Sequence, residues 1–252
     1  MAKEGRVHGF DVIRGFSVIS MVAFHACYDI AYIYGHDLGW FKPPFQDIWR
    51  ASISWVFLLV AGIMCSYSRN NLKRAGKYLL VAALIWIATT VAAVDTPISF
   101  GIIYCMGAST LIVWALEKLG LFPKSKQSTW ALAAIALAAF LLCLQLPSGR
   151  FGLGAFGGPS VRIPSEPYDS GVLSWLGFPG PAFESGDYYT PLPFSLIFIV
   201  GACLGKLCVQ YGAPSWLRKL KVAPLEWVGK HALEIYILHQ PVVLVVCQLI
   251  FG

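Results

Sequence analysis

The sequence predicts an all-α polytopic membrane protein, a bundle of about seven transmembrane helices. Of its 252 residues, 57% are hydrophobic and only 13% are charged, whereas soluble domains have about 45–50% apolar and about 25% charged residues. Apolar runs of about 18 or more residues recur along the chain, and each is long enough to cross about 30 Å of hydrocarbon. The predicted spans lie at residues 10–34, 47–67, 78–94, 98–117, 129–146, 191–211 and 225–250.

The distribution of Lys and Arg predicts the orientation of these spans. Thirteen such residues flank one side of the predicted bundle and four flank the other, and cytoplasmic loops carry the excess. We therefore expect the N-terminus in the cytoplasm and the C-terminus outside. The net charge of +6 largely reflects this topology. No nucleic-acid partner is predicted, because such proteins gather their basic residues on one soluble face. The expected partners are membrane lipids and a small-molecule or glycan substrate.

Residues 147–190 are predicted not to cross the membrane. The segment contains six prolines among many glycines, and it is too long to be an idle connection between helices. The charge distribution places it outside the cell. We therefore expect one transmembrane domain over residues 1–252, with a structured extracytoplasmic loop at about 147–190.

The first predicted span carries four ionisable residues on one face. At 100° per residue, Asp11, Arg14, His25 and Asp29 all fall within an arc of about 60°. Ionisable groups avoid lipid, so this face is expected to look into the bundle or into a water-filled cavity. Asp11 and Arg14 can pair at the cytoplasmic mouth. His25 follows 14 residues after Asp11, about 21 Å along the axis, and so lies in the outer half of the membrane.

The spacing of His25 and Asp29 is that of one helical turn. A carboxylate one turn from an imidazole can hold its tautomer and raise its basicity, as general-base histidines require. A purely structural pair that joins two helices is the alternative, but the cost of ionisable groups in a membrane favours function. His239 in the last span is expected at the same depth as His25. Two histidines at one depth allow a catalytic pair, a pair of haem ligands or a proton path. No metal site is predicted.

Several blocks of the sequence resemble a known family of membrane enzymes. They cover most predicted spans, in order: "FDVIRGFSVISMVAFHACYD", "WVFLLVAGIMCSYSR", "FGIIYCMGASTL", "DYYTPLPFSLIFIVGACLGK" and "GKHALEIYILHQP". These blocks are similar to bacterial members of the heparan-α-glucosaminide N-acetyltransferase catalytic-domain family. In the wider superfamily of membrane acyltransferases, the first helix also begins with Asp-x-x-Arg and has a histidine 14 residues after the Asp, which here are Asp11, Arg14 and His25.

The resemblance implies a transmembrane acetyltransferase in the bacterial inner (plasma) membrane, with a possible homo-oligomeric assembly. Acetyl-CoA would be the co-substrate on the cytoplasmic side, and the acetyl group would pass to an amine or hydroxyl, often of a sugar, on the far side. Asp11 and Arg14 would then serve CoA binding: Arg14 would either meet the anionic phosphates or hold Asp11 so that the mouth keeps its shape. Tyr104, Asp187 and Gln240, all within matched blocks, together with His239, are the candidates to bind the acceptor or the developing oxyanion.

Two relatives indicate different catalytic histidines. The superfamily pattern falls on His25, whereas the proposed histidine of the lysosomal enzyme that names the family falls on His36. We favour His25, because it belongs to the polar face and has Asp29 beside it. Direct transfer and an acetyl-imidazole intermediate both fit the sequence. The competing classes are a transporter or channel, and an electron carrier with haem between His25 and His239.

Overall fold

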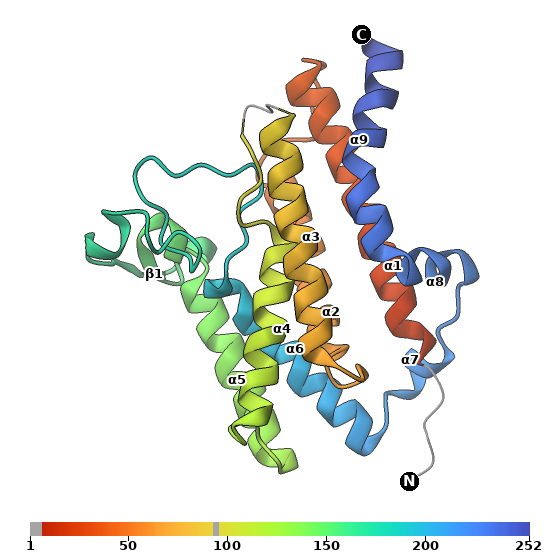
Figure 1. The fold of residues 1–252 in the computed structure, drawn as a ribbon, viewed down its shortest axis with the longest axis vertical. Coiled ribbons are helices and arrows are strands. Elements are labelled where there is room, and N and C mark those ends of the chain that lie inside the picture. The colour runs from red at the N-terminus through yellow and green to blue at the C-terminus, as the bar shows by residue number, and fades with distance from the viewer. Residues whose placement is uncertain (1–6, 93–95) are drawn as a thin grey trace. The chain divides into compact units, whose positions relative to one another are not determined.

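The computed structural model describes residues 7–92 and 96–252. Most of these residues form helices, which Figure 1 labels. The elements are α1 His8–Tyr28, the π-helix Asp29–Ile33, α2 Phe45–Ile63, α3 Asn71–Val91, α4 Ile102–Lys118, α5 Lys126–Cys143, β1 Arg150–Gly152, β2 Ser160–Arg162, α6 Pro191–Tyr211, α7 Ser215–Lys219, α8 Ala223–Lys230 and α9 Ala232–Phe251. The chain divides into two compact units, residues 1–60 with 211–252 and residues 61–210.

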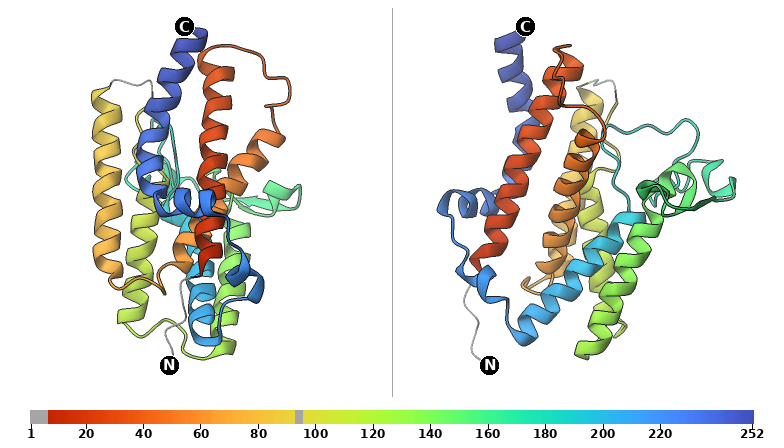
Figure 2. Two further views of the ribbon diagram at one scale, coloured as in Figure 1. Left: turned by 90° about the vertical axis from the view of Figure 1, so that its right-hand side faces the viewer. Right: turned by 180° about the vertical axis from the view of Figure 1, so that it is seen from behind.

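The first unit is organised around the first and last long helices. α1 and α9 lie side by side and run in the same direction (Figures 1 and 2). The ring of His25 contacts that of His239, and the ring of His36, in the loop after the π-helix, contacts that of Phe251 near the end of α9. The helix α1 with the loop after it therefore forms one interface with α9, and the residues in contact are about 200 positions apart in the sequence.

We name the two ends of this interface after the predicted topology: the inner end lies at the start of α1 and the outer end where α1 finishes. The helix α8 packs at the inner end, where it crosses α1 at very short range. A Cβ atom added at Gly15 would collide with the carbonyl oxygen of Leu225, and one added at Gly229 would collide with that of Asp11. Glycine is the residue that allows two backbones to approach this closely. The crossing therefore depends on a glycine from each helix.

The outer end of α1 widens into a π-helix over Asp29–Ile33. The amide of Tyr34 donates to the carbonyl oxygen of Asp29, five residues earlier, which is the hydrogen-bond spacing of a π-helix. Such turns occur mostly as short bulges within α-helices and are frequent at functional sites. Here the bulge begins at a carboxylate that is only 1% exposed.

The second unit contains α3 to α6 and the long connection before α6. α3 packs closely on α4, where a Cβ at Gly107 would meet the side chain of Leu79. Residues 147–190 fold into short turns and a hairpin in which β1 and β2 pair antiparallel, with Arg150 opposite Arg162. The expectation of a structured segment without a spanning helix agrees with this fold.

All seven predicted spans contain long helices, and within residues 7–92 and 96–252 five helices are long and apolar enough to cross a membrane. The five are His8–Ile33, Asn71–Val91, Lys126–Ser148, Pro191–Tyr211 and Ala232–Phe251. α2 begins with the polar residues Gln46, Asp47 and Arg50, and α4 has only 17 residues. The crossing of these two helices, and the orientation of the termini, stay predictions. Lys3 and Arg6, which contribute to the charge count, lie outside the described residues.

The predicted span 225–250 is wrong at its start. The helix breaks at His231, so that α8 ends at Lys230 and α9 begins at Ala232. Lys230 and Glu234, although only four positions apart, therefore lie on different helices. Instead, Lys230 Nζ lies 3.8 Å from Glu226 within α8.

Candidate active site

The centre of the first unit holds two histidines in direct contact. The ring centroids of His25 on α1 and His239 on α9 are 4.8 Å apart, with the ring planes inclined at 60°. Phe24 and Tyr236 flank them at 5.9 and 5.5 Å. The expectation that the two histidines share one depth is confirmed. Because their rings touch, no room remains between them for the flat macrocycle of a haem.

One hydrogen bond fixes the tautomer of His239. Its Nδ1 lies 2.6 Å from the carbonyl oxygen of Tyr236. A carbonyl oxygen only accepts, so Nδ1 carries the hydrogen and Nε2 of the neutral ring carries the lone pair. In the described part of the chain, this Nε2 is buried and makes no hydrogen bond. The site therefore contains an imidazole held with its basic nitrogen open, as a general base requires.

Asp29 binds Gln240 rather than the histidine suggested by the sequence. Gln240 Nε2 donates to both carboxylate oxygens of Asp29, at 3.1 and 2.9 Å. The carboxylate is enclosed where α1 widens, and a group buried there needs donors from a neighbouring helix. α9 supplies them through Gln240, while the ring of His25 faces His239. The expectation that Asp29 orients His25 is thus corrected: Asp29 orients an amide.

The inner end of the interface carries a network of charged groups. Arg14 Nη1 lies 3.6 Å from Asp11 and donates to the carbonyl oxygen of Gly229 at 3.0 Å. The guanidinium therefore joins α1 to α8 at the glycine crossing. Asp11 is buried with it, at 5% exposure. Sequence reasoning placed both residues at this end but did not give Arg14 a partner on α8.

A second ion pair at the same end was missed by the sequence. His8 Nδ1 lies 2.6 Å from Glu226 Oε2. The hydrogen bond from His8, helped by the charges of His8 and Lys230, lowers the pKa of the Glu226 carboxyl below its ordinary value. Glu226 therefore stays ionised and links the start of α1 to α8. The pairing depends on the break after α8, which the sequence does not mark, because Gly229 lies within the helix and not at the position after its end.

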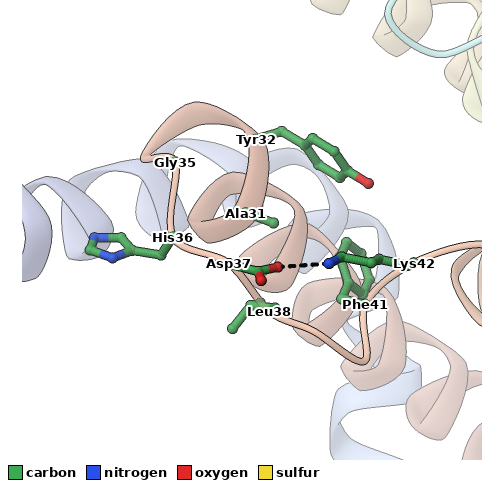
Figure 3. Close-up of a pocket in the computed structure, with 8 residues that line it drawn as sticks. All are labelled: Ala31, Tyr32, Gly35, His36, Asp37, Leu38, Phe41 and Lys42. Carbon is green, nitrogen blue, oxygen red and sulfur yellow. Dashed lines mark ion pairs between the residues drawn. The ribbon is translucent and has the colours of Figure 1, made fainter.

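His36 lies in a different place, at the outer end of the first unit. It lines an open cavity of about 220 Å³ together with residues of the π-helix and of the following loop, Ala31, Tyr32, Gly35, Asp37, Leu38, Phe41 and Lys42. In Figure 3 the His36 ring points away from the ion pair between Asp37 and Lys42, whose atoms are 3.0 Å apart. His36 contacts Phe251, which follows His239 by 12 residues, about 18 Å along α9. His36 and His25 therefore belong to different levels of the interface.

The two remaining candidates, Tyr104 and Asp187, belong to the second unit. Tyr104 donates its hydroxyl to the carbonyl oxygen of Trp175 at 3.3 Å. Asp187 accepts from the backbone amide of Ile102 at 3.0 Å and so caps the start of α4. Each has a structural contact of its own. In the described residues, no group of three or more His, Cys, Asp or Glu side chains could hold a metal ion.

Comparison with known families gives this arrangement a context. Residues 6–241 match the family described as "Heparan-alpha-glucosaminide N-acetyltransferase, catalytic". The chain belongs to this family. No curated protein and no solved structure matches it.

The heparan-alpha-glucosaminide N-acetyltransferase catalytic family is a transferase family, and the match supports an acyltransferase. The long apolar helices of the chain are those of a membrane protein. The match extends to Pro241 and so includes both histidines of the contact, as well as Asp29 and Gln240. The contact of His25 with His239 and that of Asp29 with Gln240 therefore both lie within the matched region.

Proposed function

We propose that the protein transfers an acetyl group from acetyl-CoA on the cytoplasmic side of a membrane to an amine or hydroxyl on the other side, with a small molecule or sugar as the acceptor. The family match supports the reaction class. The observation that carries the proposal is the contact of His25 with His239, in which Nε2 of His239 is left open. Ionisable groups within membrane helices are costly and are usually functional.

The histidine pair performs the proton transfer in this mechanism. The acceptor nitrogen or oxygen attacks the thioester carbon and forms a C–N or C–O bond, while the C–S bond breaks and its electron pair stays on sulfur. The proton lost by the acceptor passes to Nε2 of His239 and then to the sulfur, so that CoA leaves as the free thiol. His25, whose ring lies against that of His239, is the second imidazole of the pair and holds this base in place.

The inner end of the first unit receives CoA in this proposal. Arg14 is already engaged with α8, so its role is to keep the entrance in shape. The exposed ammonium groups of Lys219 and Lys221, and that of Lys230 beside Glu226, are better placed to meet phosphates from the cytoplasm. This assignment replaces the direct phosphate contact that the sequence suggested for Arg14.

Acetyl transfer can be tested directly with purified protein. We expect incubation with radiolabelled acetyl-CoA and a panel of amino sugars and polyols to give labelled product from at least one acceptor. Product would also begin to identify the acceptor. If no acceptor is labelled while the protein in vesicles moves a panel member across the bilayer, the polar interface serves transport and the proposed reaction is wrong.

The proposed direction of transfer requires residues 147–190 to lie outside the cell. Ser170 and Gln127 are both exposed, and the charge distribution places them on opposite sides of the membrane. We expect a Ser170→Cys variant in intact cells to react with an impermeant thiol reagent above the level of the parent protein. Gln127→Cys, its counterpart at the start of α5, should react only after the cells are opened. The reverse pattern would invert the topology and the direction of transfer.

A further inference from the structure

Two buried hydrogen-bond acceptors lie on neighbouring residues of α9. His239 Nε2 and Gln240 Oε1 are both enclosed and, among the described residues, neither has a hydrogen-bond partner. Both side chains reach toward α1, where His239 contacts His25 and Gln240 binds Asp29 one turn later. Buried polar atoms are nearly always paired, so an exception calls for an explanation such as a ligand.

The chemistry of both open atoms is fixed by their neighbours. The Tyr236 carbonyl holds the hydrogen of His239 on Nδ1. Asp29 holds the NH₂ group of Gln240 with both its oxygens, and a reversed amide would press its carbonyl oxygen against a carboxylate. Neither side chain can put a donor in the place of its open atom without losing the hydrogen bond to Tyr236 or to Asp29. What the pair requires is therefore a partner that supplies hydrogens.

This geometry changes the role that the sequence suggested for Gln240. A residue that stabilises an oxyanion must donate an N–H or O–H to it. The amide nitrogen of Gln240 is held by both oxygens of Asp29, and the atom left without a partner in the described residues is the carbonyl oxygen Oε1. This open atom can accept a hydrogen from the acceptor substrate, but it cannot donate one to the oxyanion.

We propose that His239 Nε2 and Gln240 Oε1 together bind two N–H or O–H hydrogens of the acceptor substrate. Asp29 is then a positioning residue that keeps the Gln240 amide in its accepting orientation. The site favours acceptors that carry at least two donor hydrogens, such as diols, amino alcohols and primary amines. An isolated hydroxyl satisfies only one of the two atoms. This inference rests on the proposed function for the identity of the ligand as the acetyl acceptor.

The inference can be tested with two neutral probes of similar shape, so that a difference in affinity does not come from charge or size. trans-Cyclohexane-1,2-diol offers two hydroxyl hydrogens, and cyclohexanol offers one. For the purified protein we expect equilibrium binding of the diol to be at least about tenfold tighter, because the lone hydroxyl leaves one buried acceptor unpaired. Gln240→Met should reduce this ratio to near one. Asp29→Asn should also reduce it, although Gln240 is still present, since the asparagine NH₂ group can donate to Gln240 Oε1 and so occupy this atom or reverse the amide.

The matched control is Gln248→Met, the same replacement on the same helix. Gln248 accepts from the Tyr34 hydroxyl at 3.2 Å and lies outside the pair of open acceptors. This variant should keep the preference of the parent for the diol. If the parent shows no preference, or if Gln240→Met keeps it, the inference is wrong.

The two proposals fail in different ways. If the preference is lost in Gln240→Met while no panel member is acetylated by the parent, the proposed site for two donor hydrogens stands and acetyl transfer is wrong. If acetylated product forms and Gln240→Met leaves the apparent KM for the acceptor unchanged, acetyl transfer stands and this role of Gln240 is wrong.

Discussion

Replacement of either histidine of the contact pair by alanine is expected to lower the rate of acetyl transfer by about 10²- to 10⁴-fold, the usual contribution of a positioned acid or base. His239→Ala removes the open Nε2, and His25→Ala removes the ring that lies against it. Binding of acetyl-CoA should be unchanged, because CoA enters at the other end of α1. The measurement is single-turnover transfer from labelled acetyl-CoA, with CoA binding followed separately. Because the two rings act as a unit, the double variant should lose little more than either single variant.

The control for this prediction is His36→Ala. His36 lines the outer cavity and contacts Phe251, about 18 Å along α9 from His239. Its replacement should reduce the rate only slightly. If His36→Ala is inactive while both alanine variants of the contact pair keep most of their activity, the family comparison that selects His36 is the better guide, and the contact between the helices is structural.

Gly229→Ala is expected to destabilise the first unit strongly. The added Cβ would overlap the backbone carbonyl of Asp11, and a backbone atom cannot move aside as a flexible side chain can. Overpacking typically costs about 1–3 kcal/mol, and more where the backbone itself must shift. The separation of α8 from α1 would also remove the hydrogen bond from Arg14 to Gly229. We expect a clear fall in the temperature at which the detergent-purified protein loses its folded state.

Gly76→Ala is the matched control for that measurement. Gly76 lies within α3, and a Cβ added there meets no atom within 4 Å. Alanine should therefore be neutral or stabilising by up to about 1 kcal/mol, because it favours the helix. An equal loss of stability in both variants would show that the close crossing of α1 and α8 does not control stability.

The helices were predictable because membrane spans are encoded locally. The apolar run of α1 and the common face of Asp11, Arg14, His25 and Asp29 both follow from positions along one segment. The depth of His239 followed from counting residues along a second span. The partner of Asp29 could not be predicted in this way, since Gln240 is 211 positions away and only the packing of α1 on α9 brings them together.

Other features escaped prediction for a related reason. The break at His231 was missed because hydropathy does not register a change of helix direction. The π-helix at Asp29–Ile33 has no distinctive sequence signal either. The pairing of His8 with Glu226 depends on that break, so it was out of reach until α8 was known to cross α1.

The parallel packing of α1 on α9 has a consequence for biosynthesis. Asp29 is made early, and the residue that donates hydrogen bonds to it is made 211 positions later. At about 5–20 residues per second, this carboxylate waits roughly 10–40 s for its partner. During that time the polar face of the first helix must be sheltered by the insertion machinery, a membrane chaperone or water. The ribosome therefore completes the site only as it finishes the last helix, and a chain that stalls before that point would leave a buried acid unpaired in the membrane.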